Sequence, residues 1–139
     1  EATEETITDG WLRTGDIAYM DEDEFIFLVD RAKEMVLRGG ENVYCAEVEN
    51  AIFTHESVAE CVVFGVEDER LGEEVAAAIF PKADASLDID ELRKALKDIL
   101  SSYKIPRYIW LVDAPLPRNA NGKFVKREVR DMLSLADAR

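Results

Sequence analysis

The stretch FIFLVDRAKEMVLRGGENVYCAEVE, residues 25–49, decides how the rest of the chain is interpreted. Two short apolar runs, 25–29 and 35–37, are separated by charged residues, and the second run breaks at Gly39 and Gly40. Short runs bounded by charge and glycine predict two strands joined by a charged connector and followed by a glycine turn. The connector is either a plain exposed turn or a bend at which the chain meets a charged ligand.

The composition is that of an ordinary folded domain with a strong negative charge. The 139 residues are 47% hydrophobic, which is enough for a core. The 30 acidic residues outnumber the 17 basic ones and give a net charge of −13, which argues against general binding to nucleic acid or to anionic membranes. An anionic ligand must therefore be met by a local cluster of positive charge.

Cysteine and histidine are too few and too dispersed for a metal site. Cys45, Cys61 and the single His55 match no metal-ligand spacing, so no metal site is expected in this chain. Two cysteines without a disulfide pattern favour a reduced, cytoplasmic location. No apolar run approaches the roughly 18 residues of a spanning helix, so no transmembrane segment is expected.

The hydrophobic pattern predicts strands interrupted by helices. A hairpin over 17–29 turns on acidic residues and needs a partner layer for its apolar sides. The other predicted elements are a helix at 46–54, antiparallel strands at 58–66 and 74–81, a helix at 88–100, a strand at 108–112 and a helix at 126–135. Because this order is not a strict strand–helix–strand repeat, we expect an α+β fold, a small two-layer sandwich of an antiparallel or mixed sheet with helices packed on it.

Side-chain spacing predicts which face of each helix is buried. Asp88 followed by Glu91 is typical of a helix N-terminus. In the helix at 46–54, Glu47 and Glu49 are expected to face water. The expected apolar faces are Val48, Ala51 and Ile52 in that helix, Leu92, Leu96, Ile99 and Leu100 in the next, and Val129, Met132 and Leu133 in the last.

The segment PLPRNANGK, residues 115–123, cannot form a regular helix or strand because of its prolines, asparagines and glycine. Lys123 follows an Asn-Gly turn and is predicted to be presented at its tip. The C-terminal end is locally basic, so in this acidic chain it is a place where an anion could be held. The alternative is that these bases only solvate a C-terminal helix and favour its dipole.

Three motifs in order now indicate a family. LRTGD at 12–16, DRAKEMVLRGGENV at 30–43 and PLPRNANGK at 115–123 together resemble the adenylate-forming superfamily of acyl-CoA synthetases, in the group that activates fatty or other organic acids. The resemblance implies that residues 1–32 are the tail of a large adenylate-binding domain, with its β-hairpin, and that residues 33–139 are the small mobile C-terminal domain. The partner would be the enzyme's own large N-terminal domain.

The resemblance also implies the reaction. Such an enzyme uses ATP and Mg²⁺ to convert a carboxylic acid, here a fatty or similar acid, into an acyl-adenylate, and the thiol of coenzyme A then displaces AMP. This AMP-forming acid–thiol ligase would be represented here by a fragment that is inactive alone. The alternatives are an adenylation module that passes the acyl group to a carrier-protein phosphopantetheine thiol, and a stand-alone, non-catalytic binding domain.

Three residues match the family's nucleotide chemistry. Lys123 matches the lysine that stabilises the charge developing between carboxylate and α-phosphate during adenylation. Asp16 matches the aspartate that accepts hydrogen bonds from the ribose hydroxyls, and Arg31 matches an arginine that reaches the nucleotide. The simpler interpretations are a surface lysine, a turn cap for Asp16, and an ion pair of Arg31 with Asp30.

Three further residues match the family's hinge and the loop that moves with the small domain. Lys33 matches the hinge, where one residue's dihedral angles absorb the domain rotation. Gly39 and Gly40 match a loop that approaches the pantetheine tunnel of coenzyme A; the rival interpretation is a plain hairpin turn, and the two roles are compatible. The chain departs from the family at Glu24, where a turn glycine is usual, and at Cys45, where proline usually precedes the helix.

Overall fold

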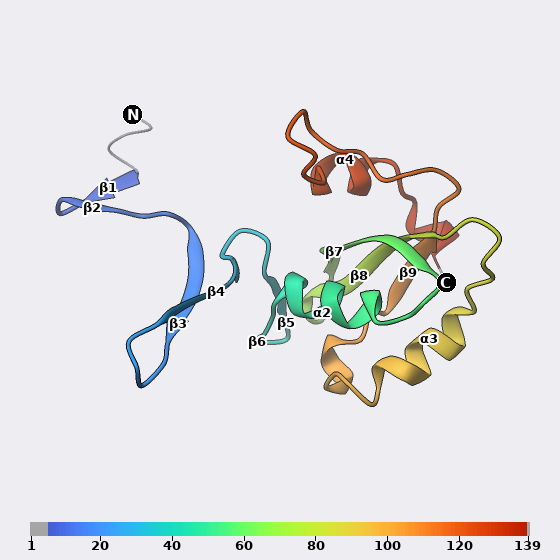
Figure 1. Cartoon of the computed structure of the whole chain (residues 1–139), viewed down its shortest axis with the longest axis horizontal. Helices are drawn as coiled ribbons and strands as arrows, with labels where there is room; N and C mark the ends of the chain where they lie inside the picture. The colour runs from blue at the N-terminus through green and yellow to red at the C-terminus, as the bar shows by residue number, and fades with distance from the viewer. Residues whose placement is uncertain (1–5, 139) are drawn as a thin grey trace.

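The computed structural model describes residues 6–138, which form a lobe and, before it in the chain, two small hairpins (Figure 1). The first hairpin pairs β1 (Ile7–Thr8) with β2 (Trp11–Leu12), and the second pairs β3 (Asp16–Met20) with β4 (Ile26–Arg31), both antiparallel. The predicted hairpin is therefore confirmed, with strands that reach Asp16 and Arg31. Within residues 6–138, no helix has the length and apolarity that crossing a membrane requires.

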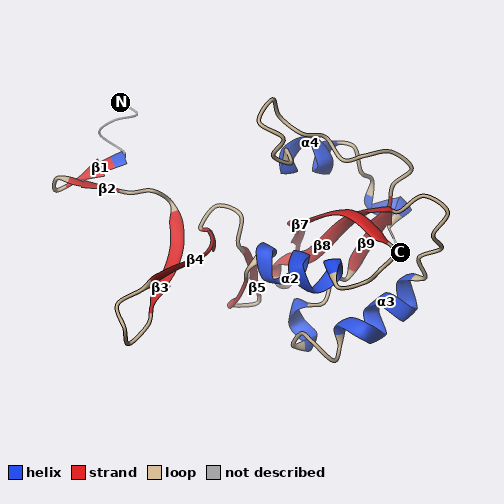
Figure 2. Ribbon diagram, viewed as in Figure 1, coloured by secondary structure: helices blue, strands red, loops and turns tan. Residues whose placement is uncertain are grey.

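The lobe contains the remaining strands and helices (Figure 2). They are β5 (Val36–Arg38), β6 (Glu41–Val43), α2 (Cys45–Phe53), β7 (Val58–Asp68), β8 (Gly72–Pro81), α3 (Ile89–Leu96), the 3₁₀ turn η1 (Ser102–Lys104), β9 (Tyr108–Leu111), α4 (Lys126–Asp131) and the 3₁₀ turn η2 (Leu135–Asp137). The five strands form one sheet in which β6, β5, β8 and β7 are neighbours in that order and β9 also pairs with β8. The β8–β9 pairing is parallel and the others are antiparallel, so the predicted mixed α+β sheet is confirmed.

Strand alternation sends apolar side chains to both faces of this sheet. Along β7, Cys61 and Val63 join the core beneath α2 and α3, whereas Val62 and Phe64 join a second cluster with Trp110. The second cluster also contains Leu116 and Val129, which come from the C-terminal segment and α4. Helical structure therefore covers both faces, and each face has its own packed core.

Helix ends and faces differ in places from the prediction. The Asp88 carboxylate accepts the backbone N–H groups of Asp90 and Glu91 at 2.8 and 3.0 Å, which confirms the N-terminus of α3. This helix ends at Leu96, so Ile99 lies beyond it and is 54% exposed rather than part of the buried stripe. Likewise α4 ends at Asp131, and Met132 is exposed.

Glu24 occupies the turn of the β3–β4 hairpin in a left-handed conformation, with φ of 66°. This is a conformation that glycine adopts without steric cost, which accounts for a glycine being the usual residue at this turn but not for the Glu found here. The carboxylate of Asp21 supports the turn by accepting the N–H groups of Asp23 and Phe25 at 3.0 and 2.9 Å. The turn is thus made by an Asp side chain and a strained Glu.

Candidate functional site

Asp16 and Arg31 are partners across the β3–β4 ladder. They occupy directly opposite register positions, and Nε of Arg31 lies 3.2 Å from Oδ1 of Asp16. Both side chains keep access to solvent. Arg31 is therefore paired with Asp16 and not, as the simpler interpretation had it, with Asp30, whose Oδ1 accepts the Arg31 backbone N–H at 2.8 Å.

The segment that carries Lys123 is held by its own hydrogen bonds. Oδ1 of Asn119 accepts the N–H groups of Asn121 and Lys123, each at 3.0 Å, and the Asn119 N–H donates to the Lys123 carbonyl at 2.8 Å. From β7, the Glu60 carboxylate anchors the approach by accepting Nη2 of Arg118 at 3.0 Å. The turn is therefore preorganised, while the Lys123 side chain remains 63% exposed.

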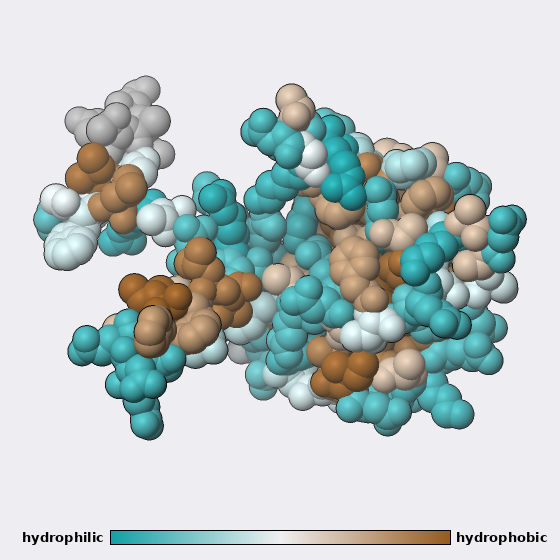
Figure 3. All heavy atoms as spheres, in the orientation of Figure 1, coloured by the Kyte–Doolittle hydropathy of each residue, from teal (hydrophilic) through white to brown (hydrophobic). Residues whose placement is uncertain are grey.

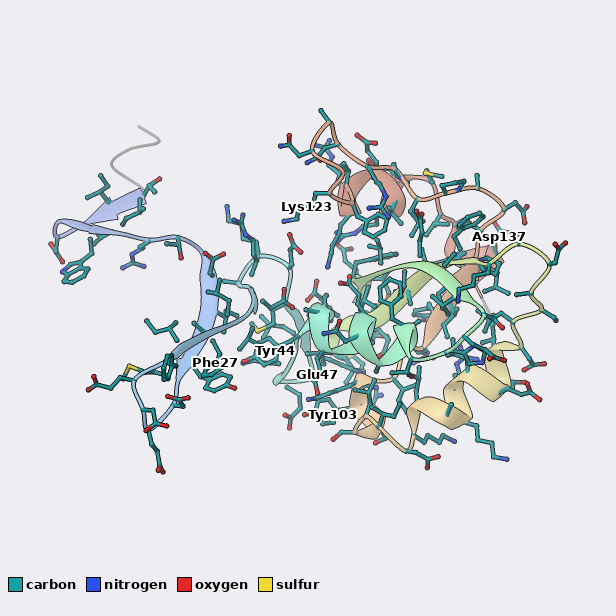
Figure 4. All side chains as sticks on the ribbon, viewed as in Figure 1. Phe27, Tyr44, Glu47, Tyr103, Lys123 and Asp137 are labelled. Carbon is teal, nitrogen blue, oxygen red and sulfur yellow. The ribbon has the colours of Figure 1, made fainter. Side chains whose placement is uncertain are left out.

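One cleft brings these distant segments together. Asp16, Arg31 and Lys123 line a cavity of about 230 Å³ together with Glu34 and residues 28–30. Nζ of Lys123 lies 4.0 Å from Oε1 of Glu34, and the side chain extends from the lobe toward the segment after β4 (Figure 4). Three residues selected from sequence thus meet around one space, whose charged lining is the carboxylates of Asp16, Asp30 and Glu34 and the cations of Arg31 and Lys123.

The connector between β4 and β5 contains Lys33, which lies at a second opening. A cavity of about 530 Å³ there is lined by Arg13, Arg31 and Lys33 among others. Just before Lys33, Oδ2 of Asp30 accepts the N–H of Ala46 in the first turn of α2 at 3.2 Å. This contact joins the residues on the two sides of the expected hinge.

Gly39 and Gly40 form the two-residue turn between β5 and β6. Their φ angles of 59° and 90° are typical of a type I′ hairpin turn, which explains both glycines locally. The Gly39 N–H also donates to the Leu71 carbonyl at 2.8 Å, and a Cβ on Gly39 would lie 3.1 Å from the Leu71 side chain. The hairpin interpretation is therefore correct for the backbone, and a role toward a ligand is compatible with it.

A partly buried ion cluster near Lys123 was missed by the sequence analysis. Nζ of Lys126 lies 3.3 Å from Glu34 and 3.2 Å from Glu49, so Glu49 does not face water as expected. Burial lowers the pKa of Lys126, but the negative groups around it outweigh that effect and the pKa lies above its ordinary value. Cys45 lies beside this cluster and donates from Sγ to the Glu34 carbonyl at 2.8 Å. The available signal was Lys126 itself, a second lysine close after Lys123 and at the start of α4.

A basic cleft lies on another side of the lobe. It has a volume of about 530 Å³. Its charged lining residues are Arg38, Arg93, Lys94, Lys97 and Arg107, with Glu74 and Asp90 as the acids. In a chain with a net charge of −13, five bases around one space make a local site for an anion.

Comparisons with known proteins show which proteins the chain as a whole is similar to. The family model of the AMP-binding enzyme C-terminal domain matches residues 47–123. Over 130 residues the chain is 43% identical to a feruloyl-CoA synthase from an Amycolatopsis species, covering 94% of this chain and 26% of that protein. It is 44% identical over 131 residues to the fatty acid–[acyl-carrier-protein] ligase ScoC of Streptomyces coeruleorubidus, covering 94% of this chain and 25% of that protein.

A solved structure is similar in the same region. The o-succinylbenzoate-CoA synthetase of Bacillus subtilis, in complex with its acyl-adenylate intermediate, superimposes with a TM-score of 0.84 at 37% identity. The match covers 92% of this chain and 26% of that one. The chain thus spans about a quarter of the length of the relatives it matches.

Proposed function

This chain belongs to the AMP-binding enzyme C-terminal domain family, as the resemblance predicted, and from that premise we propose that it contains the mobile C-terminal domain of an AMP-forming acid–thiol ligase. In this proposal residues 1–32 belong to the large domain and residues 33–139 move as one lobe. The enzyme activates a carboxylic acid with ATP and passes the acyl group to coenzyme A, in the cytoplasm. The named relatives act on both aromatic and fatty acids, and we keep a fatty or similar carboxylic acid as the substrate.

The observation that carries the proposal is the cleft shared by Asp16, Arg31 and Lys123. A carboxylate accepts hydrogen bonds from two vicinal hydroxyls, which suits the ribose of ATP, and Arg31 supplies positive charge for the phosphates. The Asp16–Arg31 pair fixes both side chains before the nucleotide arrives, at a contact of 3.2 Å. The large domain would complete the site.

Lys123 then acts on the developing charge. As a carboxylate oxygen attacks the α-phosphate and pyrophosphate leaves, negative charge builds up on the phosphate oxygens, and an ammonium held there stabilises it. Its preorganised turn holds the backbone, while its exposed, flexible stem lets the amine reach the reacting atoms. Pairing with Glu34 is loose at 4.0 Å, so little is lost when the amine moves to the nucleotide.

Lys33 is proposed as the hinge. The Asp30–Ala46 hydrogen bond spans it and exists only while residues before and after Lys33 keep this orientation. A rotation at Lys33 would break that contact and the hydrogen bonds from the Glu34 and Met35 N–H groups to the Arg31 carbonyl, at 2.9 and 3.2 Å. The Lys126 cluster lies entirely after Lys33 and would move with the lobe. Local contacts therefore favour rigid-body rotation over internal rearrangement.

The basic cleft supports coenzyme A as the acyl acceptor. Arg38 lines it and directly precedes Gly39, so the cleft and the glycine turn are adjacent. Free coenzyme A carries phosphates that such cations attract, whereas a carrier protein brings its phosphopantetheine already attached to a folded partner. No group of three or more His, Cys, Asp or Glu side chains is placed to hold a metal within residues 6–138, and no step of this proposal runs through the implied Mg²⁺.

Replacement of Lys123 tests the proposal in the complete ligase that carries this chain. Lys123→Ala should lower ATP–pyrophosphate exchange by about 10²–10³-fold, the loss typical of one preorganised charge-stabilising group. Thioester formation from a supplied acyl-adenylate should be retained. Lys82→Ala, at an exposed lysine remote from the cleft, is the matched control. Equal loss of both half-reactions in Lys123→Ala would refute the role given to this lysine.

A carrier-protein acceptor is the second candidate, favoured by the similarity to ScoC. The two candidates are separated by supplying the adenylated enzyme with either free coenzyme A or a phosphopantetheinylated carrier protein. Turnover with the carrier alone would replace our proposal of coenzyme A and leave the adenylation chemistry unchanged.

A further inference from the structure

Glu74 on β8 is a buried carboxylate with no role in the chemistry above. It is only 1% exposed, and it is the one fully buried charged residue among residues 6–138. A carboxylate in such a place is retained only when hydrogen bonds and opposite charges compensate for its lost hydration. Its partners therefore indicate what it holds in place.

Two arginines from separate segments meet at Glu74. Arg38 of β5 donates from Nε to Oε1 and from Nη2 to Oε2, the second at 3.1 Å, which is a two-pronged contact. Nη1 of Arg107, just before β9, lies 3.8 Å from Oε2. The hydrogen bond to Glu74, followed by its charge, raises the pKa of Arg38. All three residues line the basic cleft.

The β5–β6 hairpin packs Val36 and Val43 into the main core, where they are 1% and 0% exposed, but its backbone pairing to the rest of the sheet is sparse. Between β5 and β8 the ladder consists of one register pair, Arg38 with Gly72, next to the Gly39 N–H bond to Leu71. Glu73, the neighbour of Glu74, accepts the Leu37 N–H at 2.8 Å. Two successive carboxylates of β8 thus bind two successive residues of β5, and these side-chain bonds replace most of a backbone ladder.

We propose that Glu74 is a positioning residue for the thioester-forming half-reaction: through Arg38 it fixes the Gly39–Gly40 turn, and through Arg107 it keeps a second guanidinium oriented on the wall of the cleft. The inference rests on the proposed function. Arg38 uses two of its five donors on Glu74, and Arg107 is 57% exposed, so both retain donors for a phosphate-bearing thiol substrate. Adenylation uses the other cleft and should not require this clamp.

Glu74→Gln and Arg38→Lys test the clamp in the complete ligase. Gln keeps the size of Glu74 but removes its charge, whereas Lys keeps the charge of residue 38 but loses the two-pronged geometry. We expect each variant to raise the KM for coenzyme A and to lower kcat of thioester formation. Together these changes should lower kcat/KM by ~10–100-fold, since small misplacements of reacting groups have effects of that size. ATP–pyrophosphate exchange should stay within about twofold. Glu67→Gln, an exposed glutamate on β7, is the matched control.

A purely structural role predicts a different result. If Glu74 only stabilises the fold, both half-reactions should fall in proportion to the folded fraction, measured by circular dichroism, and the inference is overturned. It is also overturned if neither variant changes thioester formation. Should Glu74→Gln fail to fold, Arg38→Lys, which leaves the buried carboxylate paired, decides alone. Lys123→Ala assayed in parallel separates the two proposals, because its failure to lower exchange refutes the proposed function irrespective of Glu74.

Discussion

The β3–β4 hairpin and the lobe are built from similar apolar strands but differ in what covers them. In the hairpin, Phe25, Ile26 and Leu28 are 66–74% exposed. The rings of Tyr19 and Phe27 stack with their centroids 5.1 Å apart, and this contact lies on the surface. Apolar residues gather visibly on this hairpin (Figure 3). In the lobe, strand residues such as Ile79 and Ile109 are 0% exposed. Strand pairing alone therefore does not bury side chains, because a second layer is needed to cover each face.

This difference has a functional counterpart in our proposal. The lobe carries its own two cores and can move as a unit, whereas the hairpin leaves an apolar surface for which the large domain is the proposed partner. The adenylation cleft lies where the two parts meet, since Asp16 and Arg31 come from the hairpin and Lys123 comes from the lobe. Rotation between the two parts requires that the lobe stay packed as it moves, which its own cores allow.

The largest expected effect comes from the lobe core. Ile109→Ala should lower the free energy of unfolding of the 139-residue chain by about 2–5 kcal/mol, because it leaves a cavity at a fully buried site between layers. Urea unfolding followed by circular dichroism measures the change. Ile109→Val is the graded control, with a loss of about 0.5–1.5 kcal/mol. A loss below that of the valine variant would contradict a tightly packed lobe.

Alkaline pH should weaken the lobe through buried groups. Burial raises the pKa of Cys45 from 9.0 to about 12 and also raises that of Cys61. Between these two pKa values the folded chain keeps the thiol proton that the unfolded chain has lost. The stability that the buried thiol contributes is therefore fully present below pH 9.0 and is lost as the pH rises toward 12. For Cys45 alone the slope approaches about 1.4 kcal/mol per pH unit.

Urea titrations at a series of alkaline pH values measure this loss. The raised pKa of Lys126 acts in the same direction, since the folded lobe keeps that proton too. The double variant Cys45→Ala, Cys61→Ala should show a clearly shallower decline than the native chain. Identical declines in both proteins would show that the thiols are not the cause.

Loss of the α3 cap should have a smaller effect. Asp88→Ala removes the carboxylate that accepts two backbone N–H groups and should destabilise the lobe by about 1 kcal/mol. Asp88→Asn retains an acceptor and should recover most of that loss. Thermal unfolding measures both variants, and equal destabilisation by Ala and Asn would assign the effect to charge instead of capping.

The smallest effect is expected in the hairpin. Leu28→Ser replaces a side chain that is 74% exposed and should change the unfolding free energy of this chain by less than about 0.5 kcal/mol. The contrast between hairpin and lobe fails if this variant destabilises the chain as much as Ile109→Ala does.

Local signals in the sequence predicted most elements but not all of their ends. Asp88 predicted the start of α3 correctly because a cap is a contact between near neighbours. The end of that helix was wrong because the α-helix gives way after Leu96 to turns that still bond the Ile99 N–H to the Leu96 carbonyl but leave the Ile99 side chain exposed. Glu49 was assigned to water because helical spacing cannot reveal Lys126, which is 77 positions later in the chain and 3.2 Å away in space.

The sequence by itself determined the α+β class, the antiparallel β7–β8 pair, and Asp16, Arg31 and Lys123 as candidates, because these depend on local pattern and on motifs. Only the tertiary structure decided that the three candidates share a cleft, that Glu74 joins Arg38 to Arg107, and that the hairpin lies uncovered while the lobe is packed on both faces. Those facts depend on contacts between segments far apart in the chain, and the periodicity of one segment holds no information about which other segment covers it.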